Sequence, residues 1–124
     1  MAASDAGIAV LGQSRPHPRA YGTNARVLGK YVREEKVMSL EEAIRRMTSL
    51  PANKFNLKER GIVKEGFIAD LVVFDEKEVA DMATFENPHQ FSKGFKYVFV
   101  NGALTVENGV HNGTRKGIAI RNKY

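Results

Sequence analysis

The chain has 124 residues, 43% of them hydrophobic and 27% charged, with a formal net charge of +5 at pH 7 and no cysteine. This length and composition suit one domain with a hydrophobic core, and they argue against general disorder. The lack of cysteine excludes disulfides and thiol chemistry. The sequence shows no signal-peptide pattern and no apolar run long enough to span a membrane, so we expect a cytoplasmic protein that does not contact membranes.

Basic residues are spread along the whole sequence and often lie beside acidic ones, as in Arg33 to Lys36. Such mixing is typical of a solvated surface rather than of a basic patch that binds nucleic acid. The chain also lacks the interleaved aromatic residues on which nucleic-acid modules stack bases. We therefore expect no nucleic-acid partner. A nucleic-acid binder would instead show an affinity that falls steeply with salt.

The first part of the sequence predicts a long loop and then a helix. Residues 1–22 contain prolines and glycines without apolar periodicity, which predicts a loop. A loop of this length at the start of a compact domain is typical of a functional segment or of a segment whose support is missing. Thr23 and Asn24 can cap a helix that runs to about Glu35.

A second helix is predicted from Ser39 to Leu50. Ser39 and Glu42 have the spacing of a capping box, in which each side chain bonds to the other residue's backbone. Apolar residues follow at helical spacing. Pro51 is expected to end this helix, because the residue before a proline is disfavoured in the α region.

The rest of the sequence predicts strands and turns. Within the stretch Arg60–Asp75, the run Leu71–Phe74 has four apolar residues and no polar face, so we expect a central strand covered on both sides. Further strands are expected at 95–100, 103–106 and 117–121, with Asn-Gly turns at 101–102 and 108–109. The pattern is that of an α+β domain. Because its sheet edges are open, we expect a partner chain or another part of the same chain to add a strand.

No single motif is sufficient for catalysis. His17, His89 and His111 are far apart, with neither HxH nor HxxxH spacing, so we do not expect a complete metal site. His17 and Arg19, in a loop bounded by prolines, could hold an anion or belong to an ordinary surface loop. Asp5 suits a turn or a helix cap as well as a catalytic position.

Three further ionisable residues have structural interpretations, and a fourth has none. Asp70 is expected to bond to nearby backbone, and His89 to be structural. His111, beside a turn, is expected to be exposed to solvent. Asp81 is an ionisable candidate to which the sequence assigns no role.

Motifs along almost the whole chain resemble those of one enzyme family. The segment Gly66–Asp75 is similar to the GxxADLVVFD signature near the C-terminus of many amidohydrolases, including dihydroorotase-like and hydantoinase-like enzymes. A longer ordered series resembles the C-terminal part of the N-acyl-D-amino-acid deacylases, or D-aminoacylases. The series comprises Ser4-Asp5, His17-Pro18-Arg19, Gly22-Thr23, Leu28–Glu34, Met47–Ala52, Arg60-Gly61, Asp81, Ala83–Phe85, Pro88–Gln90 and Val100–Gly102.

The resemblance implies a fold in two parts. Residues 1–53 would be the C-terminal end of an incomplete metal-binding (β/α)8 barrel, with a loop and two helices. Residues 54–124 would be part of a small composite β-sandwich domain, which also takes a strand from the N-terminal segment of the enzyme. That strand would cover the open sheet edge.

The resemblance also implies roles for three residues. Asp5 would be the catalytic Asp after the last barrel strand, which takes a proton from metal-activated water and delivers it to the leaving amine. His17 and Arg19 would lie near the pocket and bind substrate, with Arg19 meeting a substrate carboxylate. Ala6 stands where the family usually has glycine, which bears on the geometry of this turn.

The metal ligands of the family lie upstream of the residues present here. The resemblance therefore implies a zinc-dependent hydrolase of N-acyl-D-amino acids in the complete enzyme, with no metal held by this chain alone and no activity by itself. The partner would be the missing N-terminal barrel portion, and the substrate a small N-acyl amino acid. The alternative is a non-catalytic assembly or binding module that derives from an amidohydrolase and self-associates through its β edges.

Overall fold

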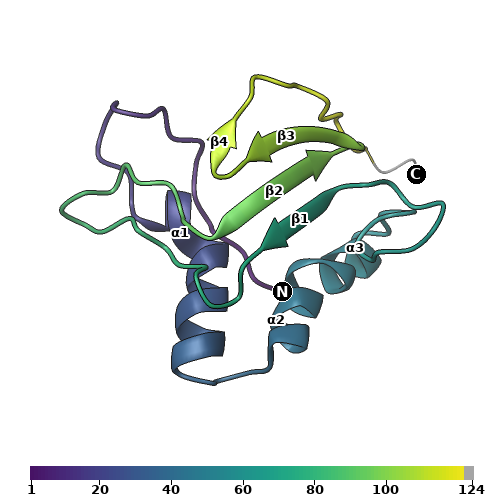
Figure 1. The fold of residues 1–124 in the computed structure, drawn as a ribbon, viewed down its shortest axis with the longest axis horizontal. Coiled ribbons are helices and arrows are strands. Elements are labelled where there is room, and N and C mark those ends of the chain that lie inside the picture. Colours follow the sequence, from purple (N-terminus) through teal and green to yellow (C-terminus); the bar gives the residue numbers. More distant parts are fainter. Residues whose placement is uncertain (122–124) are drawn as a thin grey trace.

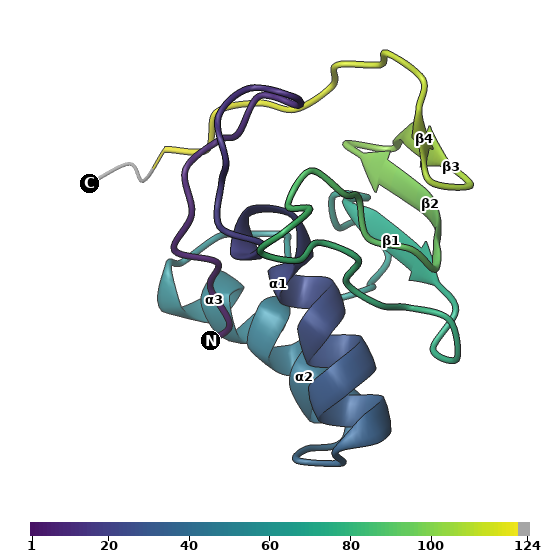
Figure 2. The ribbon, with the colours of Figure 1, turned by 90° about the vertical axis from the view of Figure 1, so that its left-hand side faces the viewer.

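A group of helices lies next to the β1 side of an antiparallel sheet in the computed structural model, which describes residues 1–121 (Figures 1 and 2). The sheet has four strands in the order β1-β2-β3-β4, and every neighbouring pair is antiparallel. This arrangement confirms the predicted α+β class. The helices are α1 (Arg19–Arg26), the π-helix η1 (Val27–Glu34), α2 (Leu40–Met47) and α3 (Ser49–Lys54), and the strands are β1 (Leu71–Phe74), β2 (Phe95–Val100), β3 (Ala103–Glu107) and β4 (Val110–His111).

Helix α1 begins earlier than the sequence predicted. Its first residue is Arg19, after Pro18, whose φ of −50° already suits a helix. The expected start at Thr23 and Asn24 is therefore wrong. Thr23 lies inside the helix, where its hydroxyl donates to the carbonyl of Arg19 at 2.9 Å. The helix then widens into η1, and the Glu35 amide bonds to a carbonyl five residues back at 2.8 Å.

The continuous helix α1–η1 lies unusually close to the segment Val79–Asp81. A Cβ atom on Gly22 would be 2.7 Å from the Asp81 Cβ, and one on Gly29 would be 2.6 Å from the Val79 carbonyl oxygen. On the other side, a Cβ on Gly94 would be 2.5 Å from the Val79 Cα. Val79 is consequently 1% exposed and lies at the centre of the small hydrophobic core.

Helix α2 begins where the sequence predicted, but it ends differently. The Ser39 hydroxyl accepts the Glu42 amide at 3.2 Å, which confirms the cap. The reciprocal half of the capping box is wrong, since the Glu42 carboxylate accepts from Arg45 and Arg46, at 2.7 Å in each ion pair. Pro51 does not end α2, which stops at Met47. Pro51 instead lies in the first turn of α3, where its missing N–H costs little.

Strand β1 is an edge strand with half-exposed side chains, so neither the expected central position nor the expected cover on both sides holds for residues 1–121. It pairs with β2 alone among the described strands, and Val72 and Val73 are 53% and 46% exposed. The expected strand at 117–121 is also wrong, because these residues form no ladder.

Both Asn-Gly turns are confirmed. All four of their residues have positive φ, between 48° and 79°, as tight hairpins require. These turns connect β2 to β3 and β3 to β4, and they fix the order of the strands. Within the described residues, no helix is long and apolar enough to cross a membrane.

Gly29→Ala tests the close contact between η1 and Val79. Alanine is normally preferred to glycine in a helix by about 1 kcal/mol, but here its Cβ would collide with backbone. We expect a loss of about 1–3 kcal/mol in the free energy of unfolding, measured with urea. Gly7→Ala is the matched control, because a Cβ on Gly7 would have no neighbour within 4 Å. A Gly29→Ala variant as stable as the parent would contradict the contact.

Glu42 makes the stability of the chain depend on pH. Hydrogen bonds from Arg45 and Arg46 lower the pKa of Glu42 to about 2. A carboxylate whose pKa falls on folding stabilises the protein above its unfolded pKa of about 4.3, and the effect is lost as the pH falls towards the folded pKa.

We therefore expect Glu42→Gln to lower Tm at pH 7, with the difference from the parent shrinking between about pH 5 and about pH 2. Thermal unfolding followed by circular dichroism measures it. Glu65→Gln is the control, because Glu65 makes no ion pair among the described residues. A Tm difference that stayed constant down to about pH 3 would show that the ion pairs contribute nothing.

Candidate functional site

The structure brings Asp5, His17 and Arg19 together. A guanidinium nitrogen of Arg19, Nη2, lies 3.2 Å from Oδ2 of Asp5. The Arg19 amide donates to Nδ1 of His17 at 3.0 Å. The Asp5 side chain is 90% exposed and the Arg19 side chain 45%. These groups therefore form an acid–base–cation cluster that a molecule in solution can reach.

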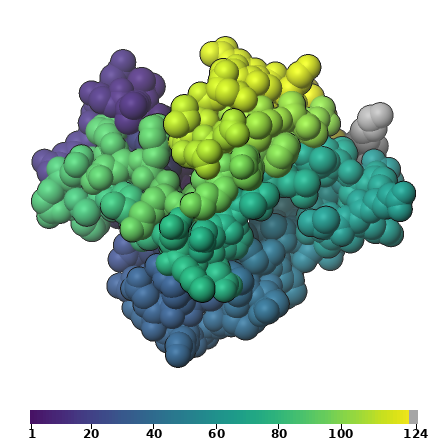
Figure 3. All heavy atoms as spheres, in the orientation of Figure 1, coloured from purple at the N-terminus to yellow at the C-terminus, as the bar shows by residue number. Residues whose placement is uncertain are grey.

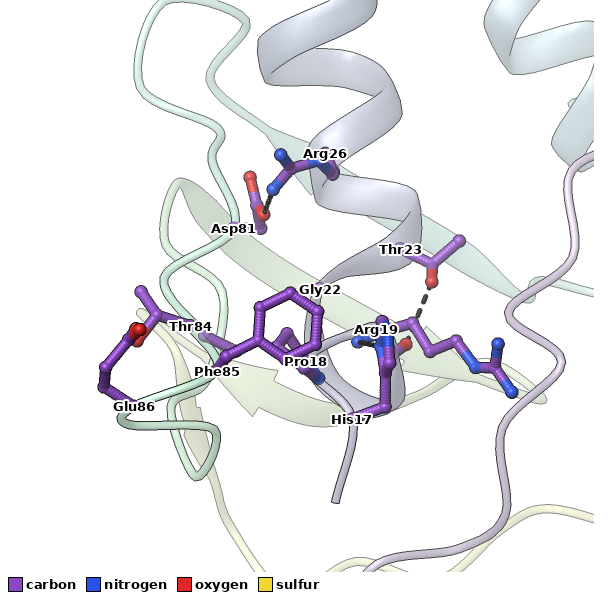
Figure 4. Close-up of a pocket in the computed structure, with 11 residues that line it drawn as sticks. His17, Pro18, Arg19, Gly22, Thr23, Arg26, Asp81, Thr84, Phe85 and Glu86 are labelled. Atoms are coloured by element: carbon purple, nitrogen blue, oxygen red, sulfur yellow. Dashed lines mark hydrogen bonds and ion pairs between the residues drawn. The ribbon is translucent and has the colours of Figure 1, made fainter. Parts of the chain in front are cut away.

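Beside this cluster lies a pocket of about 440 Å³ (Figure 4). One wall is the start of α1, and the other is the segment that follows β1. The His17 ring meets the Phe85 ring edge-on, with 4.9 Å between centroids. In Figure 4 the Arg19 side chain points away from Phe85. His17 therefore faces the pocket with its ring, whereas the Arg19 guanidinium is directed towards Asp5.

An ion pair between Arg26 and Asp81 joins the two walls. Arg26 Nη1 lies 2.6 Å from Asp81 Oδ2, and the Asp81 side chain is only 16% exposed. The hydrogen bond to Asp81, helped by its charge, raises the pKa of Arg26 above the ordinary value. Sequence reasoning missed Arg26 altogether. The two partners are 55 residues apart, and no local spacing indicates that they meet.

The other ionisable residues have structural contacts. Asp70 forms an ion pair with Arg60 and accepts the Asn101 amide at 2.7 Å, which confirms its predicted bond to nearby backbone. His89 bonds to the Tyr21 hydroxyl and the Ser14 carbonyl, at 3.0 Å each, as a structural residue would. His111 is exposed beside its turn, as predicted.

The described residues do not fit a complete metal centre. Within residues 1–121, no group of three or more His, Asp or Glu side chains is arranged so that it could hold a metal ion. Asp5, the carboxylate of the candidate site, has Arg19 as its ion-pair partner. A metal ion at this site would therefore need ligands from outside the described residues.

Comparison with known proteins identifies the family. The model of the amidohydrolase family matches residues 1–106. The chain belongs to the amidohydrolase family. This confirms the resemblance expressed by the GxxADLVVFD segment and by the ordered series of motifs.

Several relatives are deacylases of N-acyl-D-amino acids. The chain is 47% identical over 103 residues to the D-aminoacylase of Alcaligenes xylosoxydans xylosoxydans, covering 83% of this chain and 21% of that protein. It is 51% identical over 87 residues to the N-acyl-D-aspartate deacylase of the same organism, covering 70% of this chain and 18% of the relative. The chain thus spans about a fifth of the length of these relatives.

Solved structures give the same relationship. A crystal structure of D-aminoacylase superposes with a TM-score of 0.81 at 50% identity, covering 83% of this chain and 22% of that chain. The N-acyl-D-glutamate deacylase of Bordetella bronchiseptica, solved with zinc and a phosphonate mimic of the tetrahedral intermediate, superposes with a TM-score of 0.73 at 53% identity, covering 73% of this chain and 19% of that one.

The contribution of the Arg26–Asp81 pair can be measured with a double-mutant cycle. We expect the variants Arg26→Ala and Asp81→Ala to show a coupling energy of about 1 kcal/mol in urea unfolding, since Arg26 is partly screened by water. The control is the pair Lys30–Glu35, which is 3.6 Å apart with both side chains 40% or more exposed. Its coupling should be near zero. Equal coupling for the two pairs would show that Asp81 gains nothing from its burial.

Proposed function

We propose that this chain is part of a zinc-dependent hydrolase that cleaves the amide bond of N-acyl-D-amino acids, and that it is inactive without the rest of that enzyme. Relatives at 47% and 51% identity are deacylases of this substrate class, and the chain covers about a fifth of each. The observation that carries the proposal is the exposed contact between Asp5 and Arg19 at 3.2 Å.

Each residue of the cluster has a distinct role in this proposal. The Asp5 carboxylate transfers the proton in amide hydrolysis, because an accessible carboxylate can accept a proton and return it to a leaving amine. Arg19 binds the carboxylate of the substrate, because the negative charge of that group is opposite to the charge of the guanidinium. His17 lines the pocket beside Phe85 and contacts the substrate. In the complete enzyme, zinc would be held by ligands from outside this chain. It would polarise the scissile amide and activate water.

The two halves of the chain then belong to two domains of the complete enzyme. In this proposal, residues 1–53 are the end of the barrel, and residues 54–124 are part of the composite β-domain. The open edge of β1 supports the second assignment, because an unpaired edge accepts another strand. The missing N-terminal portion is the partner that would supply it.

A second candidate function is a non-catalytic assembly module. A groove of about 650 Å³ runs beside β1, lined by residues of α2, of the approach to the strand and of β1 itself, among them the apolar Ile44, Ile62 and Val72. Such a groove next to a free edge supports pairing of two copies of the chain. This module would associate in solution without acquiring activity.

Complementation distinguishes the two candidates. The chain is mixed with zinc and with the segment of D-aminoacylase that precedes the matching region, and hydrolysis of N-acyl-D-amino acids is measured. We expect no hydrolysis by the chain alone and hydrolysis by the mixture. Asp5→Asn should reduce the restored rate at least about a hundredfold, the usual contribution of an acid–base group. Asp75→Asn, away from the pocket, is the matched control.

Two outcomes would contradict the proposal. Hydrolysis by the 124-residue chain alone would show that the active centre is complete without further protein. A stable dimer in light scattering, with no activity in the mixture, would favour the assembly module instead.

A further inference from the structure

The segment Gly12–His17, which we call the site loop, leads into the candidate site without forming a helix or strand. Its backbone is nevertheless bent sharply, with φ of 77° at Gly12 and 58° at Ser14. The left-handed region is unfavourable for serine, so contacts from elsewhere must hold this conformation. In Figures 1 and 3 the N-terminal residues lie beside the long connection between β1 and β2.

His89, in that connection, contacts the site loop through both ring nitrogens. Nε2 lies 3.0 Å from the Ser14 carbonyl oxygen. A carbonyl can only accept, so Nε2 carries the proton. The Gly12 amide, which can only donate, lies 3.4 Å from Nδ1, so Nδ1 is an acceptor, and the Tyr21 hydroxyl lies 3.0 Å from the same nitrogen. One ring thus determines how the site loop sits on helix α1.

The surroundings of His89 reinforce this position. Tyr21 belongs to α1, two residues after Arg19, and its ring meets the His89 and Phe91 rings edge-on, at 5.7 Å in each pair. Arg15 of the site loop donates from Nε and Nη2 to the carbonyls of Phe85 and Glu86, at 3.2 Å each. The Arg15 contacts hold the loop at one point, and the His89 contacts hold its left-handed bend.

We propose that His89 is a positioning residue, which fixes the site loop through Ser14 and so places His17 and Arg19 for the substrate. The role of His89 in substrate binding rests on the proposed function. The fixation of the site loop by His89 concerns this chain alone. His17 is three residues from Ser14, and Arg19 bonds to the His17 ring through its amide. A loop released at Ser14 would therefore loosen the His17 ring from Phe85 and the Arg19 guanidinium from Asp5.

Nuclear magnetic resonance on the 124-residue chain tests the fixation. The nitrogen shifts of His89 should show the neutral ring protonated at Nε2. Backbone order parameters of the site loop should be near the rigid value of about 0.85 in the parent, and should fall below about 0.6 in His89→Asn. The amide of His89→Gln reaches the position of Nε2 and keeps a donor for Ser14, so it should restore most of the order.

Two further variants, one control and one second test, complete the experiment. His111→Asn changes an exposed histidine and should leave the site loop unchanged. Tyr21→Phe removes a single hydroxyl and retains the ring, so it should loosen the loop in part. This variant keeps the proposal testable if His89→Asn does not fold. The β2–β3 hairpin should keep its order parameters in every folded variant.

Activity of the complemented enzyme gives a separate readout. His89→Asn should raise KM about tenfold with a smaller change in kcat, because the displaced side chains bind substrate. A mixture without activity would overturn the proposed function and leave the order-parameter result valid. An unchanged site loop in both His89→Asn and Tyr21→Phe, or a His89 ring protonated at Nδ1, would overturn the positioning role.

Discussion

The close approach of helix α1–η1 to the segment Val79–Asp81 holds the two halves of the molecule together. Two glycines, Gly22 and Gly29, lie seven residues apart on one face of the helix, and neither has room for a Cβ atom. Arg26 and Arg33 have the same spacing and bind the same segment from the side. Arg26 pairs with Asp81, and Arg33 donates to the Val79 carbonyl at 2.7 Å.

The geometry of the candidate site follows from this contact. The segment that Arg26 and Arg33 bind continues into the connection that carries Phe85 and His89, and this connection lies over the residues that precede α1. Without the helix contact, the segment that follows β1 would not be held opposite the start of α1, and the pocket would lose one of its two walls. The site is thus formed by parts of the sequence that are about 70 residues apart, and the helix packing holds them side by side.

Local patterns predicted part of the local structure, although the start of α1 and the end of α2 were wrong. The Ser39 cap and both Asn-Gly turns depend on interactions within a few residues, which a short stretch of sequence encodes completely. The error at β1 has a different origin. Its four apolar residues indicate burial, but burial depends on what packs against the strand, and residues 1–121 leave its edge and much of Val72 and Val73 uncovered.

The candidate site residues remain a prediction, whereas several contacts around them could not be predicted. The family resemblance selected Asp5, His17 and Arg19, and in the structure Arg19 contacts Asp5 through its guanidinium and His17 through its amide. Sequence reasoning could not find the Arg26–Asp81 pair, because nothing in either local sequence indicates a partner 55 residues away. It also gave His89 a structural role without identifying the loop that it holds.

Native-state amide hydrogen exchange tests most directly whether the helix contact unites the two halves that form the site. If it does, amides of η1 and amides of β2 will exchange through the same opening, with opening free energies that agree within about 0.5 kcal/mol and fall together as denaturant is added. The contrary result is exchange of η1 through a separate opening, with an opening free energy more than about 2 kcal/mol lower than that of β2. It would show that the helices detach while the sheet remains folded. That result would contradict a site held in place by the contact between α1–η1 and Val79.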